Sequence, residues 1–274
     1  MDFITISVKC DAELSDVIIA ELFEIGFDSF QEFDDGFEGS CEETAFKEIG
    51  VEEILKRYPS ATFTIKEQER INWNEEWEKN YDPIVVDDRC QVRATFHKAN
   101  TAFEYDILVN PKMSFGTGHH ATTYQMLSYQ MNLDHQGKKV LDVGTGTGIL
   151  AIMASKRGAS QIVATDIDDW CIENSAENFS LNEIDDIQLV KGEIGVVEKA
   201  DFDIIIANIN KNVLMDQIRE YSSRLAANGF LLLSGFYKED VDDLLGEAKA
   251  HGLAKQNETE KDRWAMLALS KPKP

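Results

Sequence analysis

The sequence predicts an α/β protein in two parts, a small α+β unit followed by a larger unit built on a mostly parallel sheet. The chain has 274 residues, which allows two domains of ordinary size. Over residues 1–70 the hydrophobic pattern changes in the order strand, helix, strand, strand, helix, strand. From Lys138 onward, short apolar strands alternate with helical stretches, which is the pattern of a parallel sheet covered by helices.

The order of elements in residues 1–70 is that of the split βαβ, ferredoxin-like arrangement. Residues 12–25 carry apolar side chains three and four positions apart, which predicts an amphipathic helix, and Gly26 follows as a stop. The turn residues 34–36 (Asp-Asp-Gly) lie between two alternating stretches, so a hairpin is expected there. A second helix is expected over 44–58. The expected strands are 3–8, 27–33, 37–41 and 62–68.

Residues 71–99 are predicted to form a linker that consists of a short helix and a strand. Trp73 and Trp77 lie four positions apart on the expected helix 72–81, so they share one face, which is typical of a linker that packs against a neighbouring domain. Residues 100–274 are assigned to the second domain. Strands are expected over 84–96 and 103–109.

The remaining elements of the second domain follow the alternation of apolar strands and amphipathic helices. The run Ile204-Ile205-Ile206 suits a strand that is buried on both faces of the sheet. Two final strand patterns, 253–258 and 264–269, have no helix between them, so an antiparallel strand is expected at or beside the sheet edge. The other expected strands are 140–143, 161–165, 187–191, 202–207 and 230–233, and the expected helices are 149–157, 168–181, 212–226 and 238–251.

Charge is the unusual feature of the composition. The chain has 27 Lys+Arg against 50 Asp+Glu, a net charge of −23, and residues 1–70, with 18 acidic and 6 basic side chains, contribute −12 of it. Such a protein repels nucleic acid backbones and attracts basic partners. The four cysteines are widely spaced, no apolar run is long enough to span a membrane, and the start of the sequence shows no secretory signal. These features favour a cytoplasmic protein.

The strongest local motif is the glycine loop Gly144-Thr145-Gly146-Thr147-Gly148, which follows an acid and a strand and opens a helix. It departs from the dinucleotide fingerprint because Ile149 occupies the third glycine position, and from the P-loop because it has no lysine. The next strand ends at Asp166, where a carboxylate can accept hydrogen bonds from both hydroxyls of an adenosine ribose. Asp168 better suits the N-cap of the following helix.

This combination resembles the class I S-adenosylmethionine-dependent methyltransferases, whose Rossmann-like sheet has seven strands with the last one antiparallel. Two further segments resemble one family within that class, the ribosomal-protein methyltransferases of the PrmA type. The linker tryptophans and the ferredoxin-like front match the same family, so the resemblance runs essentially end to end. His119, Ala121 and the run Asn210-Lys211-Asn212 depart from the family's usual residues. The two segments are Phe115-Gly116-Thr117-Gly118-His119-His120-Ala121-Thr122-Thr123 and Ala207-Asn208-Ile209.

The resemblance implies a protein-lysine methyltransferase that acts on large-subunit ribosomal protein eleven, at lysine side chains, the N-terminal amine or both. Residues 1–70 are expected to bind that protein. Asn208 is expected to be catalytic, because its amide oxygen can orient the acceptor amine. No metal is expected, since the adjacent His119 and His120 point apart on most backbones. The residues expected to bind S-adenosylmethionine are Phe115, Thr117, Thr123, Gly144, Gly146, Asp166 and Asn208.

The chemistry requires a neutral amine aligned with an already activated methyl group, so no dedicated general base is expected. Deprotonating a lysine of pKa about 10.4 at neutral pH costs about 4 kcal/mol, and desolvation lowers that pKa. The alternatives are a methyltransferase of another protein or of a small-molecule amine, a nucleic-acid methyltransferase, an NAD-dependent oxidoreductase and a non-catalytic binding module. A monomer without direct nucleic acid or membrane contact is expected.

Overall fold

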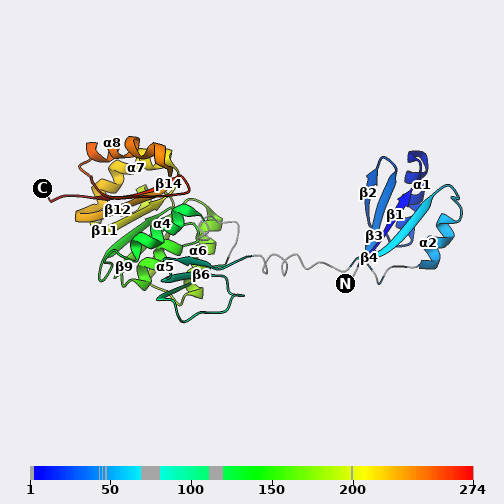
Figure 1. Ribbon diagram of the computed structural model, residues 1–274, viewed down its shortest axis with the longest axis horizontal. Coiled ribbons are helices and arrows are strands. Elements are labelled where there is room, and N and C mark those ends of the chain that lie inside the picture. Colours follow the sequence, from blue (N-terminus) through cyan, green and yellow to red (C-terminus); the bar gives the residue numbers. More distant parts are fainter. Residues whose placement is uncertain are drawn as a thin grey trace. The chain divides into compact units, whose positions relative to one another are not determined.

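The computed structural model describes residues 3–42, 44, 46, 48–68, 81–110, 120–198 and 200–273 (Figure 1). The chain forms two compact units, Met1–Tyr81 and Asp82–Pro274. The predicted linker helix, with Trp73 and Trp77, lies outside the described residues. Within the described ranges, no helix is both long and apolar enough to cross a membrane.

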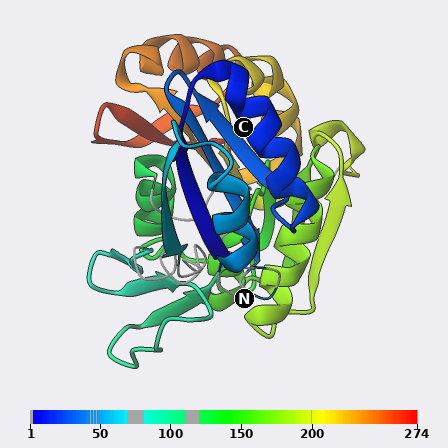
Figure 2. The same ribbon diagram turned by 90° about the vertical axis from the view of Figure 1, so that its right-hand side faces the viewer.

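The smaller unit is a four-stranded antiparallel sheet with both of its helices on one face (Figure 2). The strand order β2-β3-β1-β4 confirms the ferredoxin-like arrangement. The core lies between the sheet and the helices and includes Ile6, Ile18 and Phe37. It forms there because the apolar side chains lie on one face of the sheet and on one face of the first helix. The elements are β1 (Phe3–Lys9), α1 (Ala12–Glu24), β2 (Ser29–Phe33), β3 (Gly36–Glu42), α2 (Glu48–Leu55) and β4 (Thr62–Gln68).

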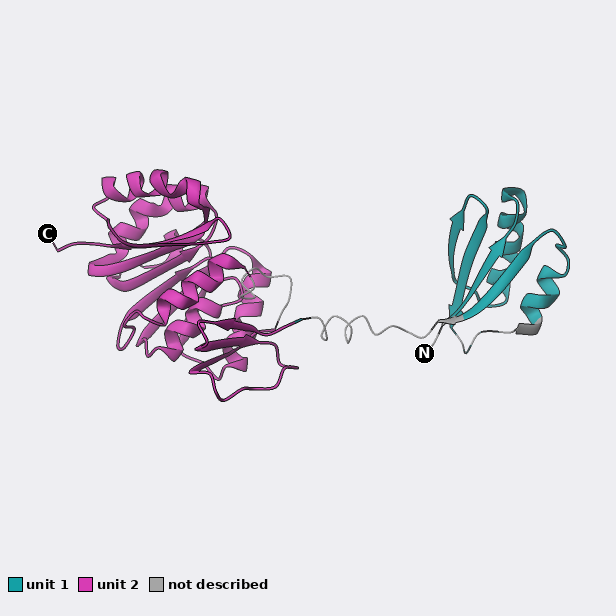
Figure 3. Ribbon diagram, in the orientation of Figure 1, with its two compact units in different colours: residues 1–81 teal, residues 82–274 magenta. Residues whose placement is uncertain are grey.

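The larger unit, magenta in Figure 3, is built on a seven-stranded sheet of order β10-β9-β8-β11-β12-β14-β13. The last strand, β14, runs antiparallel to both of its neighbours, and the other pairs are parallel. This confirms the predicted seven-stranded sheet with an antiparallel last strand. The strands are β8 (Lys139–Val143), β9 (Gln161–Asp166), β10 (Ile187–Lys191), β11 (Phe202–Asn208), β12 (Leu225–Tyr237), β13 (Ala254–Lys261) and β14 (Trp264–Ser270).

Helices cover both faces of this sheet, α4, α5 and α6 on one side and α7 and α8 on the other (Figure 1). Ile204 and Ile206 belong to the first core and Ile205 to the second, and all three are buried, as the apolar run predicted. The helices are α4 (Ala121–Gln130), α5 (Ile149–Lys156), α6 (Asp169–Leu181), α7 (Lys211–Arg224) and α8 (Val241–Ala250), with 3-10 turns η2 (Ile194–Val196) and η3 (Lys238–Asp240).

Several predicted elements differ from the structure in their bounds; the helix expected over 44–58, for example, spans Glu48–Leu55. The single strand expected over 84–96 is divided by a tight turn in which Asp87 and Asp88 have φ of 50° and 53°. The helix expected over 212–226 ends at Arg224, because the next residue is extended and begins β12. The two parts of the divided strand form a three-stranded sheet with the strand expected over 103–109. The apolar side chains of this sheet join the core of the larger unit. Its strands are β5 (Ile84–Val86), β6 (Cys90–Arg93) and β7 (Tyr105–Leu108).

Candidate functional site

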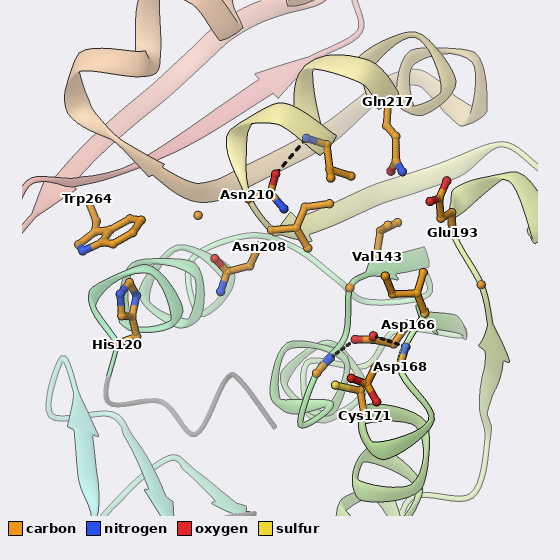
Figure 4. A pocket seen from close by; sticks show the side chains of 17 residues that line it. His120, Val143, Asp166, Asp168, Cys171, Glu193, Asn208, Asn210, Gln217 and Trp264 are labelled. Atoms are coloured by element: carbon orange, nitrogen blue, oxygen red, sulfur yellow. Dashed lines mark hydrogen bonds between the residues drawn. The ribbon is translucent and has the colours of Figure 1, made fainter. Parts of the chain in front are cut away.

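A pocket of about 530 Å³ opens at the carboxyl ends of the parallel strands in the larger unit (Figure 4). Ligands of parallel α/β sheets bind at this edge because the loops that follow the strands meet there. The structure brings four of the predicted cofactor residues to the lining of this pocket, namely Gly144, Gly146, Asp166 and Asn208.

The glycine loop between β8 and α5 borders the pocket. Gly144 and Gly146 have φ of +71° and +56°, in the left-handed region that favours glycine. The backbone N–H of Gly144 donates to the carbonyl of Thr165 at 2.8 Å, which ties the loop to β9. A Cβ atom on Gly144 would lie 2.2 Å from Cγ2 of Ile209, so the segment after β11 can pack against the loop only because this residue is a glycine.

Asp142, the acid before the loop, is buried behind it and does not line the pocket. One carboxylate oxygen accepts a hydrogen bond from the hydroxyl of Thr145 at 2.7 Å. Burial raises the pKa of Asp142 to about 7, because a charged carboxylate is poorly solvated there. Its contact with Thr145 makes it a support for the loop.

Asp166 ends β9 with its carboxylate held in place by two backbone amides. One oxygen accepts from the N–H of Gly146 at 2.9 Å and the other from the N–H of Asp168 at 3.1 Å (Figure 4). Each carboxylate oxygen can accept a further hydrogen bond, so the group has acceptor capacity left for a ligand in the pocket. Asp168 accepts from the N–H of Trp170 at 2.8 Å, which confirms its predicted role as the N-cap of α6.

Asn208 ends β11 and has an unsatisfied acceptor. Its Nδ2 atom donates to the hydroxyl of Thr123 at 3.4 Å, whereas its Oδ1 atom is buried with no hydrogen-bond partner among the described residues. An unpaired buried acceptor costs about 1–3 kcal/mol. The side chain therefore offers a binding position for an N–H donor. Thr123 lies in α4, is fully buried and supports Asn208 without lining the pocket itself.

Trp264 and His120 form the end of the pocket beside Asn208 (Figure 4). The imidazole N-caps α4 by accepting from the N–H of Thr122 at 3.3 Å, and burial lowers the pKa of His120, which favours the neutral ring that can accept this bond. The two rings meet edge to face, with centroids 4.5 Å apart. Trp264 belongs to no sequence motif, and it reaches the pocket only because β14 pairs with β12 and β13.

Glu193 and Gln217 lie at the opposite end of the pocket and were also missed from the sequence (Figure 4). Glu193 follows β10, the third parallel strand along the chain, so its position at the same sheet edge was a usable signal. Gln217 lies on α7, where nothing in the sequence distinguishes it from an ordinary helix residue. Phe115 and Thr117 lie outside the described residues.

Two of the residues that depart from the family pattern after Asn208, namely Asn210 and Lys211, have structural partners. Asn210 is the N-cap of α7, because its side chain accepts from the N–H of Val213 at 3.1 Å. The ammonium group of Lys211 lies 2.7 Å from the carboxylates of both Asp240 and Asp243. These contacts hold the start of α7 in place directly after Asn208.

Comparison with known proteins points to one family. Residues 4–272 match the family model described as Ribosomal protein L11 methyltransferase (PrmA). A ribosomal protein L11 methyltransferase of Phocaeicola vulgatus is 43% identical over 264 residues, 94% of each chain. One of Bacteroides thetaiotaomicron is 42% identical over 267 residues, 95% of each chain. A crystal structure of a ribosomal protein L11 methylase from Lactobacillus delbrueckii subsp. bulgaricus aligns with a TM-score of 0.66 at 29% identity, covering 70% of this chain and 100% of that one.

Proposed function

We propose that this chain, which belongs to the ribosomal protein L11 methyltransferase family, methylates amino groups of ribosomal protein L11. The acceptors are lysine side chains, the N-terminal amine or both, and the methyl donor is S-adenosylmethionine. The observation that carries the proposal is the buried Oδ1 atom of Asn208, which has no partner among the described residues and lies in the same pocket as Asp166.

The pocket has the groups that S-adenosylmethionine needs. The carboxylate of Asp166, oriented by the amides of Gly146 and Asp168, can accept hydrogen bonds from two ribose hydroxyls. Gly144 and Gly146 present bare backbone at the pocket wall, which permits close approach of a ligand. When bound, the cofactor supplies a methyl group that is already activated on a sulfonium.

The residues on the acceptor side orient the amine. Oδ1 of Asn208 accepts an N–H of the amine, which directs the nitrogen lone pair, and the hydroxyl of Thr123 holds the other end of the same amide. The rings of Trp264 and His120 line this end of the pocket. Desolvation beside the positively charged sulfonium of the bound cofactor disfavours a charged ammonium, so it lowers the pKa of an entering lysine toward the neutral form that reacts.

Mass spectrometry of L11 incubated with the chain and S-adenosylmethionine tests the proposal. We expect mass increases of whole methyl groups on L11, and none on L11 whose amines have been chemically blocked beforehand. Equal methylation of an unrelated basic protein or of free lysine would reject L11 as the specific substrate and favour a broader amine methyltransferase.

Residues 1–70 are proposed to bind the L11 substrate. They form a unit with its own hydrophobic core and a charge of −12, whereas L11, as a ribosomal protein, must expose basic surface to bind RNA. Residues 100–274 are proposed as the catalytic domain and 71–99 as the connection, of which the part from Asp82 onward packs as part of the larger unit. We further propose that the enzyme acts as a cytoplasmic monomer without direct contact to nucleic acid, because its net charge of −23 opposes such contact.

Removal of the smaller unit tests this division of roles. A chain that begins at Asn72 is expected to bind S-adenosylmethionine with a Kd within about threefold of the full chain, because the pocket residues all lie in the larger unit. Its kcat/KM for intact L11 should fall about tenfold or more, since the docking surface is lost. Methylation of L11 at the rate of the full chain would contradict the proposed role of residues 1–70.

Salt dependence tests whether charge guides this docking. The kcat/KM for L11 should fall about tenfold between about 0.05 and 0.5 M salt, because the Debye length shortens from about 10 Å at 0.1 M to about 3 Å at 1 M. The Kd for S-adenosylmethionine should change little, since the ligand is held by short buried contacts. If both quantities respond alike, or neither responds, the acidity of residues 1–70 does not steer the substrate.

A further inference from the structure

Helix α6 presents a row of three asparagines to the segment of chain that leaves β7. Asn174, Asn178 and Asn182 are spaced four positions apart, so they lie along one face of the helix. Asn174 and Asn178 are buried, and Asn182 is the C-cap of the helix. Buried amides on a helix need specific partners. Each of the three has at least one, although Oδ1 of Asn174 is buried without a partner among the described residues.

The three side chains bond the backbone of residues 108–110 much as a neighbouring strand would. Asn182 accepts from the N–H of Leu108 at 3.0 Å and donates to its carbonyl at 2.7 Å. Asn178 accepts from the N–H of Asn110 at 2.7 Å through its Oδ1 atom. Asn174 donates to the carbonyl of Asn110 at 3.2 Å. Side chains of α6 therefore fix the end of β7, and the side chain of Asn110 adds a donated bond to Oε1 of Glu177 at 2.8 Å.

Asn178 has a second partner, in the glycine loop. Its Nδ2 atom donates to the carbonyl of Thr147 at 2.8 Å. Helix α6 comes this close to the loop because residue 148 is a glycine: a Cβ there would lie 2.5 Å from the ring of Phe179 and 3.1 Å from Cβ of Ser175. One buried amide thus bonds both the loop and Asn110, and only a group with an acceptor and a donor side by side can do this.

We propose that Asn178 is a positioning residue that couples the glycine loop of the pocket to the segment that leaves β7. The glycine loop bonds the carboxylate of Asp166 through the N–H of Gly146, so a shift of the loop also shifts this bond. Asn178 sets the position of both backbones relative to each other. This inference rests on the proposed function, because that function assigns the glycine loop and Asp166 to the cofactor.

Asn182 is a matched control. It bonds the same segment, at Leu108, from the same helix, and among the described residues it makes no hydrogen bond to the glycine loop. Asn178→Ala and Asn182→Ala each remove an amide that bonds this segment, so both should lower the thermal unfolding temperature of the full chain. Only Asn178→Ala should change the glycine loop.

Two measurements on the full chain test the coupling. In calorimetry, Asn178→Ala should raise the Kd for S-adenosylmethionine about tenfold, within the usual range of coupling between sites, and Asn182→Ala should leave it within about twofold. In hydrogen exchange, S-adenosylmethionine should slow the exchange of the Asn110 amide in the unchanged chain, and should fail to slow it in Asn178→Ala.

The inference is overturned if Asn178→Ala and Asn182→Ala lower the unfolding temperature alike and both leave the Kd unchanged, because Asn178 then only stabilises the fold. If Asn178→Ala does not fold, hydrogen exchange in the unchanged chain still tests the inference. The coupling is overturned if the Asn110 amide exchanges at the same rate with and without S-adenosylmethionine. If the unchanged chain binds no S-adenosylmethionine at all, the proposed function itself fails, and the inference fails with it.

Discussion

Replacing Asn208 with alanine is expected to lower the kcat for methylation of L11 about a hundredfold, the usual cost of misplacing a reacting group by about 1 Å. The variant removes the buried Oδ1 acceptor that has no partner among the described residues, and with it the group that would orient the amine. The Kd for S-adenosylmethionine should rise by less than about tenfold, because Asp166 and the glycine loop remain in place.

Asn210→Ala is the matched control for this experiment. Asn210 lies two residues further along and lines the same pocket, but its side chain is engaged as the N-cap of α7. Its loss should cost about 1 kcal/mol of stability and leave kcat within about threefold. If both variants lose kcat to the same extent, the effect comes from the loosened start of α7, and Asn208 has no separate role in orienting the amine.

Replacing Asp166 with alanine is expected to raise the Kd for S-adenosylmethionine at least about a hundredfold, because two hydrogen bonds to a charged group are lost at about 1.5–3 kcal/mol each. The variant also leaves the N–H groups of Gly146 and Asp168 without their acceptor. Asp166→Asn keeps one acceptor and should give an intermediate Kd. Calorimetry measures all of these values.

Asp169→Ala controls for the loss of a negative charge near this edge of the sheet. Asp169 is exposed at the first turn of α6 and pairs with Lys191 on the surface, outside the pocket lining. Exposed ion pairs contribute about 0–1 kcal/mol, so the Kd should stay within about twofold. An unchanged Kd for Asp166→Ala would reject the assignment of Asp166 to the ribose.

The sequence predicted those parts of the fold that depend on local pattern. The buried run Ile204-Ile205-Ile206 has the composition of a central parallel strand, and the final two strand patterns without an intervening helix predicted the antiparallel β14. The turn at Asp87-Asp88 escaped prediction because both residues adopt positive φ without a glycine or asparagine to signal it. The early end of α7 escaped because Leu225 fits a helix as well as a strand.

The site residues that the sequence revealed are those carried by a loop motif or by a strand end. Trp264 and Gln217 reach the pocket through packing of elements that are distant in sequence, and their own neighbours carry no signal. Asn178 looks like any polar residue of an amphipathic helix until its partners at Asn110 and Thr147 are known. The role of such residues depends on which distant parts of the chain they contact, and the local hydrophobic pattern contains no information about those contacts.

The place of β14 in the sheet has a consequence for how the protein is made. β13 is synthesised before β14, yet it pairs only with β14, which lies between it and β12. During synthesis from the N-terminus, β13 therefore has no partner until residues 264–270 have emerged. The half of the pocket around Asp166 can form earlier, whereas the wall made by Trp264 is the last part to be assembled. The strands that carry the glycine loop and Asp166 are thus synthesised before the strand that completes the wall of the pocket.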